Sequence, residues 1–203
     1  MEPDARTRVH VDVWWIGDRA ADDALLERVA ADVAREFAAR VRVHEPRDRP
    51  QGTFDPRRGQ HASRDVLRWL LQHAPPPPGR LLGLTDVDLF IPVLTFVFGE
   101  AQLDGPAAVV STARLAQAGD AGLTAARVGR EAVHELGHTF GLLHCGAADA
   151  TPGRPRSCVM SRSASVRAVD AKSARLCAGC RARYALFQQD GSHVYREHQN
   201  PHR

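Results

Sequence analysis

The chain has 203 residues, of which 43% are hydrophobic, and its 27 basic and 24 acidic side chains give a formal net charge of +3. This length is enough for one globular domain with a substantial core. No apolar run approaches the roughly twenty residues that a membrane-spanning helix needs. The near balance of charge, without aromatic residues interleaved among the arginines, argues against a nucleic-acid-binding protein.

Strands and helices alternate along the first two thirds of the sequence. Branched and aromatic residues predict a strand over 9–16, and apolar residues at helical spacing predict a helix over 22–39. The polar stretch 47–60 is expected to be a loop. The other predicted elements are strands over 41–44, 81–89, 95–101 and 107–111, and helices over 63–73 and 124–140. This order predicts an α/β fold.

A His-Glu-x-x-His-x-x-Gly-x-x-His motif begins at His134. His134 and His138 lie one helical turn apart on one face, so both ring nitrogens can reach a single metal ion. Gly141 can adopt a positive φ, which lets the helix end and brings His144 back to the same ion. Three histidine ligands leave the fourth zinc position for water, and Glu135 stands beside it as the candidate general base.

This ligand set predicts a catalytic zinc and the hydrolysis of peptide bonds. Loss of Glu135 should leave the metal bound and abolish the chemistry. Glu131, one turn earlier on the same helix, is expected to be a solvated surface residue. The sequence contains no Gly-x-Ser-x-Gly motif that would indicate a serine nucleophile instead.

All four cysteines lie in the C-terminal part of the chain, and the last two form a Cys-x-x-Cys pair. They are Cys145, Cys158, Cys177 and Cys180. Four thiolates with one tight pair are typical of a structural zinc site, with two disulfides as the main alternative. Residues 1–6 are polar and charged, unlike a secretion signal, so we expect a cytoplasmic location in which thiols stay reduced.

The order of these motifs resembles the archaemetzincin family of zinc metallopeptidases. The resemblance lies in the histidine motif, Cys145 directly after His144, the Cys-x-Met sequence of Cys158 and Met160, and the final Cys-x-x-Cys pair. Segments 55–60 and 94–101 are also similar to the family. Twelve residues separate Cys145 from Cys158, more than the family usually has. A surface loop can absorb such an insertion at small entropic cost.

The resemblance implies a metzincin-like fold, in which a twisted mixed sheet lies over the active-site helix and a small irregular C-terminal subdomain is stapled by zinc. It implies two zinc ions per chain. The catalytic ion would be bound by His134, His138 and His144 with Glu135 as base, and the structural ion by Cys145, Cys158, Cys177 and Cys180. Met160 would form the Met-turn beneath the catalytic metal. Strand 96–101 would lie at the edge of the sheet above the cleft, where it either pairs with an extended peptide or is an ordinary edge strand that packs on the helix.

We therefore expect one metallopeptidase domain over 1–203. Its sheet and helix part would extend to about residue 141, its C-terminal subdomain would cover about 142–187, and 188–203 would be a flexible tail. The expected protein is a monomer that acts on a peptide or protein substrate, without a nucleic-acid or membrane partner. Aminopeptidase action remains open at this stage. Two other readings also remain open, a non-enzymatic module with two structural zinc ions and a zinc ribbon that binds nucleic acid.

Overall fold

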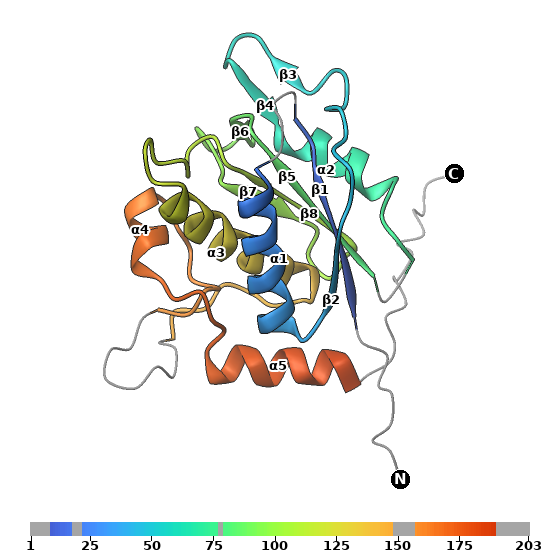
Figure 1. Cartoon of the computed structure of the whole chain (residues 1–203), viewed down its shortest axis with the longest axis vertical. Coiled ribbons are helices and arrows are strands. Elements are labelled where there is room, and N and C mark those ends of the chain that lie inside the picture. The colour runs from blue at the N-terminus through green and yellow to red at the C-terminus, as the bar shows by residue number, and fades with distance from the viewer. Residues whose placement is uncertain (1–8, 18–21, 77–78, 148–156, 190–203) are drawn as a thin grey trace.

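The computed structural model describes residues 9–17, 22–76, 79–147 and 157–189, which form a layered α/β structure (Figure 1). The central sheet has five strands in the order β2-β1-β5-β8-β7. They are β1 (His10–Trp15), β2 (Arg40–Val43), β5 (Arg80–Thr85), β7 (Gly99–Ala101) and β8 (Ala107–Ser111). The strand pairs are parallel except for β7, which runs antiparallel to β8 at one edge. The predicted α/β fold with a twisted mixed sheet is therefore confirmed.

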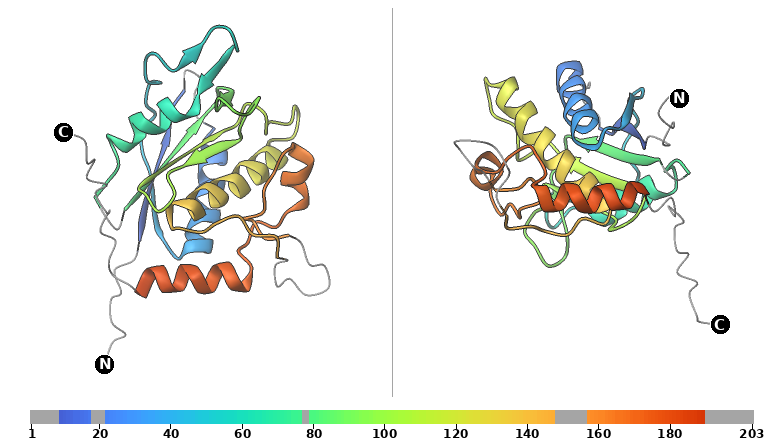
Figure 2. Two further views of the ribbon diagram at one scale, coloured as in Figure 1. Left: turned by 180° about the vertical axis from the view of Figure 1, so that it is seen from behind. Right: turned by 90° about the horizontal axis from the view of Figure 1, so that it is seen from below.

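Helices cover both faces of this sheet because successive strand residues point to opposite sides. In β1, Val11 and Val13 pack in the core cluster formed with α1 (Asp23–Phe37) and α3 (Ala121–Thr139). Trp14 belongs to the opposite cluster, with α2 (Ser63–Leu71). Figure 1 shows α1 in front of the sheet, and the view from behind in Figure 2 shows α2 in front of it.

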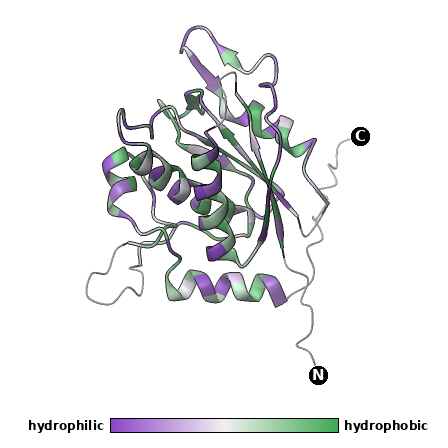
Figure 3. Ribbon diagram, viewed as in Figure 1, coloured by the Kyte–Doolittle hydropathy of each residue, from purple (hydrophilic) through white to green (hydrophobic). Residues whose placement is uncertain are grey.

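A second, three-stranded sheet corrects two of the sequence predictions. It consists of β3 (Phe54–Asp55), β4 (Gln60–Ala62) and β6 (Leu89–Phe90). The predicted loop 47–60 thus contains a strand, and the predicted strand 81–89 is divided between two sheets. The division occurs because Asp88 turns toward β4, accepting hydrogen bonds from His61 N and Gln60 Nε2 at 2.8 and 2.9 Å. Figure 3 shows both hydrophilic (purple) and hydrophobic (green) residues in this small sheet.

The predicted strand over 95–101 is shorter in the structure, where only Gly99–Ala101 is a strand. The carbonyl of Thr95 accepts a hydrogen bond from the side chain of Gln60 at 2.9 Å rather than from a neighbouring strand. Val97 N donates to Leu89 O at 2.9 Å, so the segment before β7 pairs with β6 only through an isolated bridge. None of the helices within the described ranges is long and apolar enough to cross a membrane.

The C-terminal part of the chain contains two helices that the sequence analysis did not predict, α4 (Val166–Ala171) and α5 (Ala178–Gln189). Figures 1 and 2 show α5 lying across the lower end of the molecule, below α1. The Tyr184 hydroxyl on α5 donates a hydrogen bond to Phe37 O at 2.8 Å. Its ring packs against Phe37 and Phe140 with centroid distances of 5.1 and 5.0 Å. The predicted tail begins within α5, and residues 190–203 lie outside the described residues.

We expect Tyr184→Ala to lower the free energy of unfolding by roughly 3–5 kcal/mol, because it removes a buried ring that joins α5 to α1 and α3. Tyr184→Phe keeps the ring and loses only the hydrogen bond, so its effect should be about 1 kcal/mol. Urea unfolding followed by circular dichroism measures both. Equal stability of the wild type and Tyr184→Ala would show that α5 does not depend on this contact.

Candidate active site

Helix α3 brings His134 and His138 together, one turn apart. Their Nε2 atoms lie 3.2 Å apart, and their ring planes are nearly perpendicular at 88°. Gly141 has a φ of 74°, which ends the helix and turns the chain back. The ring centre of His144 then lies 5.3 Å from that of His134 and 4.8 Å from that of His138. The three predicted imidazoles therefore meet, with candidate ligand atoms within 4.8 Å of one another.

Backbone carbonyls fix the orientation of two of these rings. Nδ1 of His134 is bonded to Val159 O at 2.8 Å, and Nδ1 of His138 to Leu142 O at 2.7 Å. A carbonyl oxygen can only accept, so each Nδ1 carries the ring proton and donates it. Each neutral ring then keeps its Nε2 lone pair, which is the state that a metal ligand requires.

The site also keeps its histidines uncharged. Burial lowers the pKa of His134 well below its ordinary value, with further lowering by the positive charge of Lys172. Burial likewise lowers the pKa of His138, and burial together with the neighbouring His138 and Arg162 lowers that of His144 to about 4. All three rings are therefore neutral near pH 7.

Glu135 lies beside the histidines under the edge strand β7. Burial raises the pKa of Glu135 well above its ordinary value, and the nearby carboxylates of Glu131 and Glu100 raise it further. Gly99 on β7 permits the close approach, since a Cβ there would lie 2.7 Å from Glu135 Cγ and 3.0 Å from its Oε1. The carboxyl group thus sits between the helix and the edge strand.

Glu131 is not the solvated surface residue that the sequence suggested. Its side chain is 4% exposed and forms an ion pair with the Nζ of Lys172, which is 1% exposed, at 2.7 Å. Lys172 also donates a hydrogen bond to Ser161 O. Two buried charges are tolerated because each neutralises the other. Lys172 is the chain's only lysine, and no local sequence pattern connects it with Glu131.

A cleft of about 580 Å³ opens over these groups. One wall is the segment Leu94, Thr95, Phe96, Val97, Phe98 and Gly99, and the opposite side is formed by Glu131, His134, Glu135, His144, Arg162, Ser163 and Ala164. The first wall is largely apolar and the second carries the polar chemistry. Such a cleft, with a few convergent polar groups, is typical of a binding or catalytic site.

The four cysteines form a second cluster, with their sulfur atoms within 4.8 Å of one another and none in a disulfide. Backbone N–H groups donate to these sulfurs, from Cys177 to Cys158 Sγ at 3.2 Å and from Cys180 to Cys177 Sγ at 3.5 Å. Hydrogen bonds from its neighbours, set against burial, lower the pKa of Cys177 to about 7. Burial raises the pKa values of Cys158 and Cys180. The inserted residues 148–156 between the first two cysteines lie outside the described residues.

Met160 is fully buried beneath α3. A Cβ on Gly137 would clash with its Sδ atom, which explains why the helix carries a glycine at this position. The backbone around Met160 joins the two clusters, since Cys145 N donates to Met160 O at 3.0 Å and Ser161 Oγ donates to Cys145 O at 2.7 Å. Met160 therefore supports the histidine site and the sulfur cluster together.

Comparison with known proteins identifies the family of this chain. Residues 79–185 match Peptidase family M54. The chain is 34% identical to the archaemetzincin of Haloarcula marismortui over 181 residues, which cover 85% of this chain and 97% of that protein. It is 42% identical to the archaemetzincin of Methanopyrus kandleri over 146 residues, covering 71% of this chain and 78% of that protein.

Two crystal structures of archaemetzincins have the same fold. The protein from Methanopyrus kandleri superposes with a TM-score of 0.75 at 33% identity, covering 93% of this chain and 99% of its own. The protein from Archaeoglobus fulgidus, complexed with malonate, gives a TM-score of 0.71 at 33% identity and covers 86% of this chain and 99% of its own. The chain belongs to the archaemetzincin family, Peptidase family M54, and is a zinc metallopeptidase.

Proposed function

We propose that His134, His138 and His144 hold the catalytic zinc of this peptidase and that Glu135 is the general base of peptide-bond hydrolysis. The observation that carries the proposal is the pair of hydrogen bonds from Nδ1 of His134 and His138 to backbone carbonyls. They leave the lone pairs of the two Nε2 atoms free, and these atoms lie 3.2 Å apart. Three neutral imidazoles with room for a fourth ligand are the donor set of catalytic zinc sites.

When bound there, zinc would polarise the scissile carbonyl and lower the pKa of the attacking water. Glu135 accepts the proton of that water on a carboxylate oxygen and returns it to the leaving amine. The burial that raises the pKa of Glu135 favours its holding the proton between these two transfers. The positive charge of Lys172 lowers the pKa values of His134, His138 and His144, which keeps their nitrogens available as ligands.

The substrate is a peptide held between the two walls of the cleft. β7 ends the central sheet, and the segment leading into it lines the cleft. An exposed strand edge can bind an extended peptide through main-chain hydrogen bonds while pockets receive its side chains. We propose that the edge formed by residues 96–101 does so here.

Aminopeptidase action would need a carboxylate in the cleft to bind the free amino group of the substrate. Among the described residues that line the cleft, only Glu131 and Glu135 are acidic. Glu131 is paired with Lys172, and Glu135 has the role of base. Asp88 does not line the cleft and is occupied in an ion pair with Arg114 at 2.6 Å. The lining residues therefore offer no free carboxylate for a substrate amino group, which favours cleavage within a peptide or at its C-terminal end.

We propose a second, structural zinc ion on Cys145, Cys158, Cys177 and Cys180, in the C-terminal subdomain over about 142–187. Three of the four thiols are buried, and backbone N–H groups already point at their sulfurs. Four clustered thiolates with one Cys-x-x-Cys pair are the donor set of closed zinc sites. Such thiols persist in a reducing compartment, in keeping with the expected cytoplasmic location. The monomeric state remains a prediction from the sequence.

Glu135→Gln should reduce peptide cleavage by about 10²–10⁴-fold, because the amide cannot accept the proton of the attacking water. The same variant should keep its zinc, since Glu135 is not among the proposed ligands. Metal content by mass spectrometry and the digestion of a peptide library, run side by side on wild type and variant, measure the two effects separately.

Two outcomes of that experiment would contradict the proposal. If Glu135→Gln cleaved peptides as fast as the wild type, Glu135 would not be the general base. If the zinc-loaded wild type cleaved no peptide, the protein would instead be a non-enzymatic module with two structural zinc ions. His138→Ala is the matched variant, because it should lose the catalytic zinc while the cysteine-bound zinc stays.

Cys180→Ser should reduce the bound zinc from about two ions per chain to about one, because one of four ligands is lost. It should also lower the midpoint of thermal unfolding, since the free energy of metal binding stabilises the fold. Metal analysis and calorimetry test this together. Retention of both ions in Cys180→Ser would show that the cysteines do not hold the second one.

A further inference from the structure

Arg162 introduces a positive charge into the cleft. Of the described residues that line the cleft, it alone has a permanently cationic side chain. It lies two residues after Met160, its side chain is exposed, and its Nε donates a hydrogen bond to Nδ1 of His144 at 3.0 Å. This contact places the guanidinium group directly beside the histidine cluster.

The acidic groups of the cleft are engaged elsewhere. Glu131 is paired with Lys172 at 2.7 Å, and Glu135 is the proposed base. Within the described ranges, Arg162 forms no ion pair with a carboxylate, and its two Nη groups have no hydrogen-bond acceptor. A guanidinium group presents its N–H donors in a planar fork that matches the two oxygens of a carboxylate. The cleft therefore contains a carboxylate-binding group without a carboxylate.

The hydrogen bond between Arg162 and His144 cannot persist when His144 binds zinc. The hydrogen bond from Arg162 uses the Nδ1 lone pair of the neutral ring. If His144 binds zinc through Nδ1, that lone pair goes to the metal. If it binds through Nε2, Nδ1 carries the ring proton and becomes a donor. In either case Arg162 loses its acceptor when His144 acts as a ligand, and the whole guanidinium group needs another partner.

Ser163 offers a second donor at the same wall. Its side chain lines the cleft, and its Oγ is buried without a hydrogen-bond partner among the described residues. A hydroxyl can rotate its O–H toward an incoming acceptor. The opposing wall of Phe96, Val97 and Phe98 is mainly apolar, and exclusion of water by such a wall strengthens a charge-assisted hydrogen bond.

We propose that Arg162, with Ser163 beside it, recognises a carboxylate of the peptide substrate next to the scissile bond. The carboxylate belongs either to an acidic side chain or to the free C-terminus, and the chemistry of recognition is the same for both. The inference rests on the proposed function, because the position next to the scissile bond follows from the place of Arg162 in the cleft lining, beside the proposed ligand His144.

The test compares matched peptides in which one residue near the cleavage site is Glu or Gln, each with a free or an amidated C-terminus. Wild-type, zinc-loaded enzyme should cleave the carboxylate-bearing member about 10–100-fold more efficiently in kcat/KM. In Arg162→Gln this ratio should fall to about one, whatever happens to the absolute rate. Arg162→Glu should instead favour a peptide with Lys at that position.

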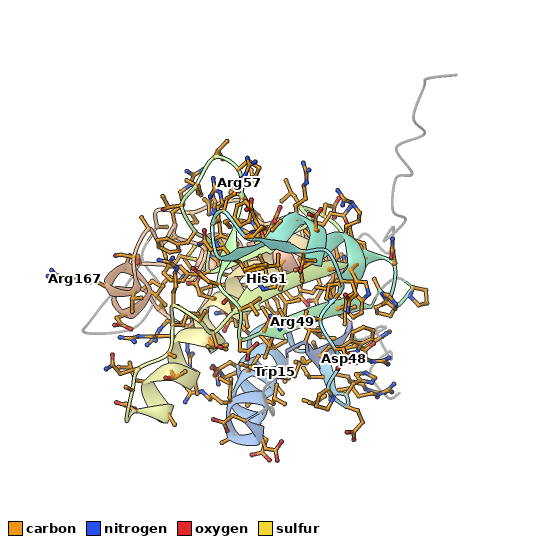
Figure 4. The ribbon with its side chains drawn as sticks, turned by 90° about the horizontal axis from the view of Figure 1, so that it is seen from above. Trp15, Asp48, Arg49, Arg57, His61 and Arg167 are labelled. Carbon is orange, nitrogen blue, oxygen red and sulfur yellow. The ribbon has the colours of Figure 1, made fainter. Side chains whose placement is uncertain are left out.

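Arg167→Gln is the matched control. Arg167 is also an exposed arginine of the C-terminal subdomain, but it does not line the cleft, and Figure 4 shows it on α4 at the outer edge of the molecule. For Arg167→Gln, the ratio of kcat/KM between the carboxylate-bearing peptide and its uncharged partner should equal that of the wild type. If the enzyme prefers Glu over Gln but does not distinguish a free from an amidated C-terminus, the recognised carboxylate belongs to the side chain. If it prefers the free C-terminus but does not distinguish Glu from Gln, the carboxylate is that of the C-terminus.

A binding experiment separates this inference from the proposed function. Fluorescence anisotropy of labelled Glu and Gln peptides on zinc-loaded Glu135→Gln should show tighter binding of the carboxylate member, and this preference should disappear in Glu135→Gln/Arg162→Gln. If the wild type cleaves no peptide, the proposed hydrolysis fails while this measurement still decides the role of Arg162. Equal ratios in the wild type and Arg162→Gln, by cleavage or by binding, would overturn the inference.

Discussion

Two hydrogen bonds from imidazole N–H groups to backbone carbonyls determine what this site can do. They join His134 to Val159 O and His138 to Leu142 O at 2.8 and 2.7 Å. Each bond fixes a ring, its tautomer and the direction of its free lone pair. Without them, neither ring would have a partner that fixes its tautomer, and the spacing in the sequence would not by itself present two Nε2 lone pairs to one metal ion.

The first of these carbonyls ties the cleft to the cysteine cluster. Val159 lies between Cys158, whose sulfur belongs to the cluster, and Met160, which packs under α3 at Gly137. The backbone of Cys145 bonds back to Met160 at 3.0 Å. Ordering the sulfur cluster therefore also orders the segment that holds His134. The C-terminal part of the chain is in this sense part of the active site, although it contributes no strand to either sheet.

The sequence revealed the features that depend on local spacing and missed those that depend on distant contacts. The meeting of His134, His138 and His144 follows from helical geometry and one glycine, and strand 107–111 has the bounds that its branched residues predict. The Glu131–Lys172 pair joins residues far apart in the chain, so no local sequence pattern indicates it. Helix α5 was missed because only Cys180 and Tyr184 on it are buried, which is too few to give an apolar pattern at helical spacing. The strands of the small sheet were missed because they are only two or three residues long.

The central claim is that one metal ion is shared by three imidazoles. A crystal structure of the protein grown with zinc, with anomalous data collected at the zinc edge, tests it most directly. The account predicts an anomalous peak about 2.0–2.1 Å from a nitrogen of each of the three rings, with Nδ1 of His134 and His138 still bonded to their carbonyls. Rings that diverge in the presence of ample zinc, or a peak only at the cysteine cluster, would contradict it.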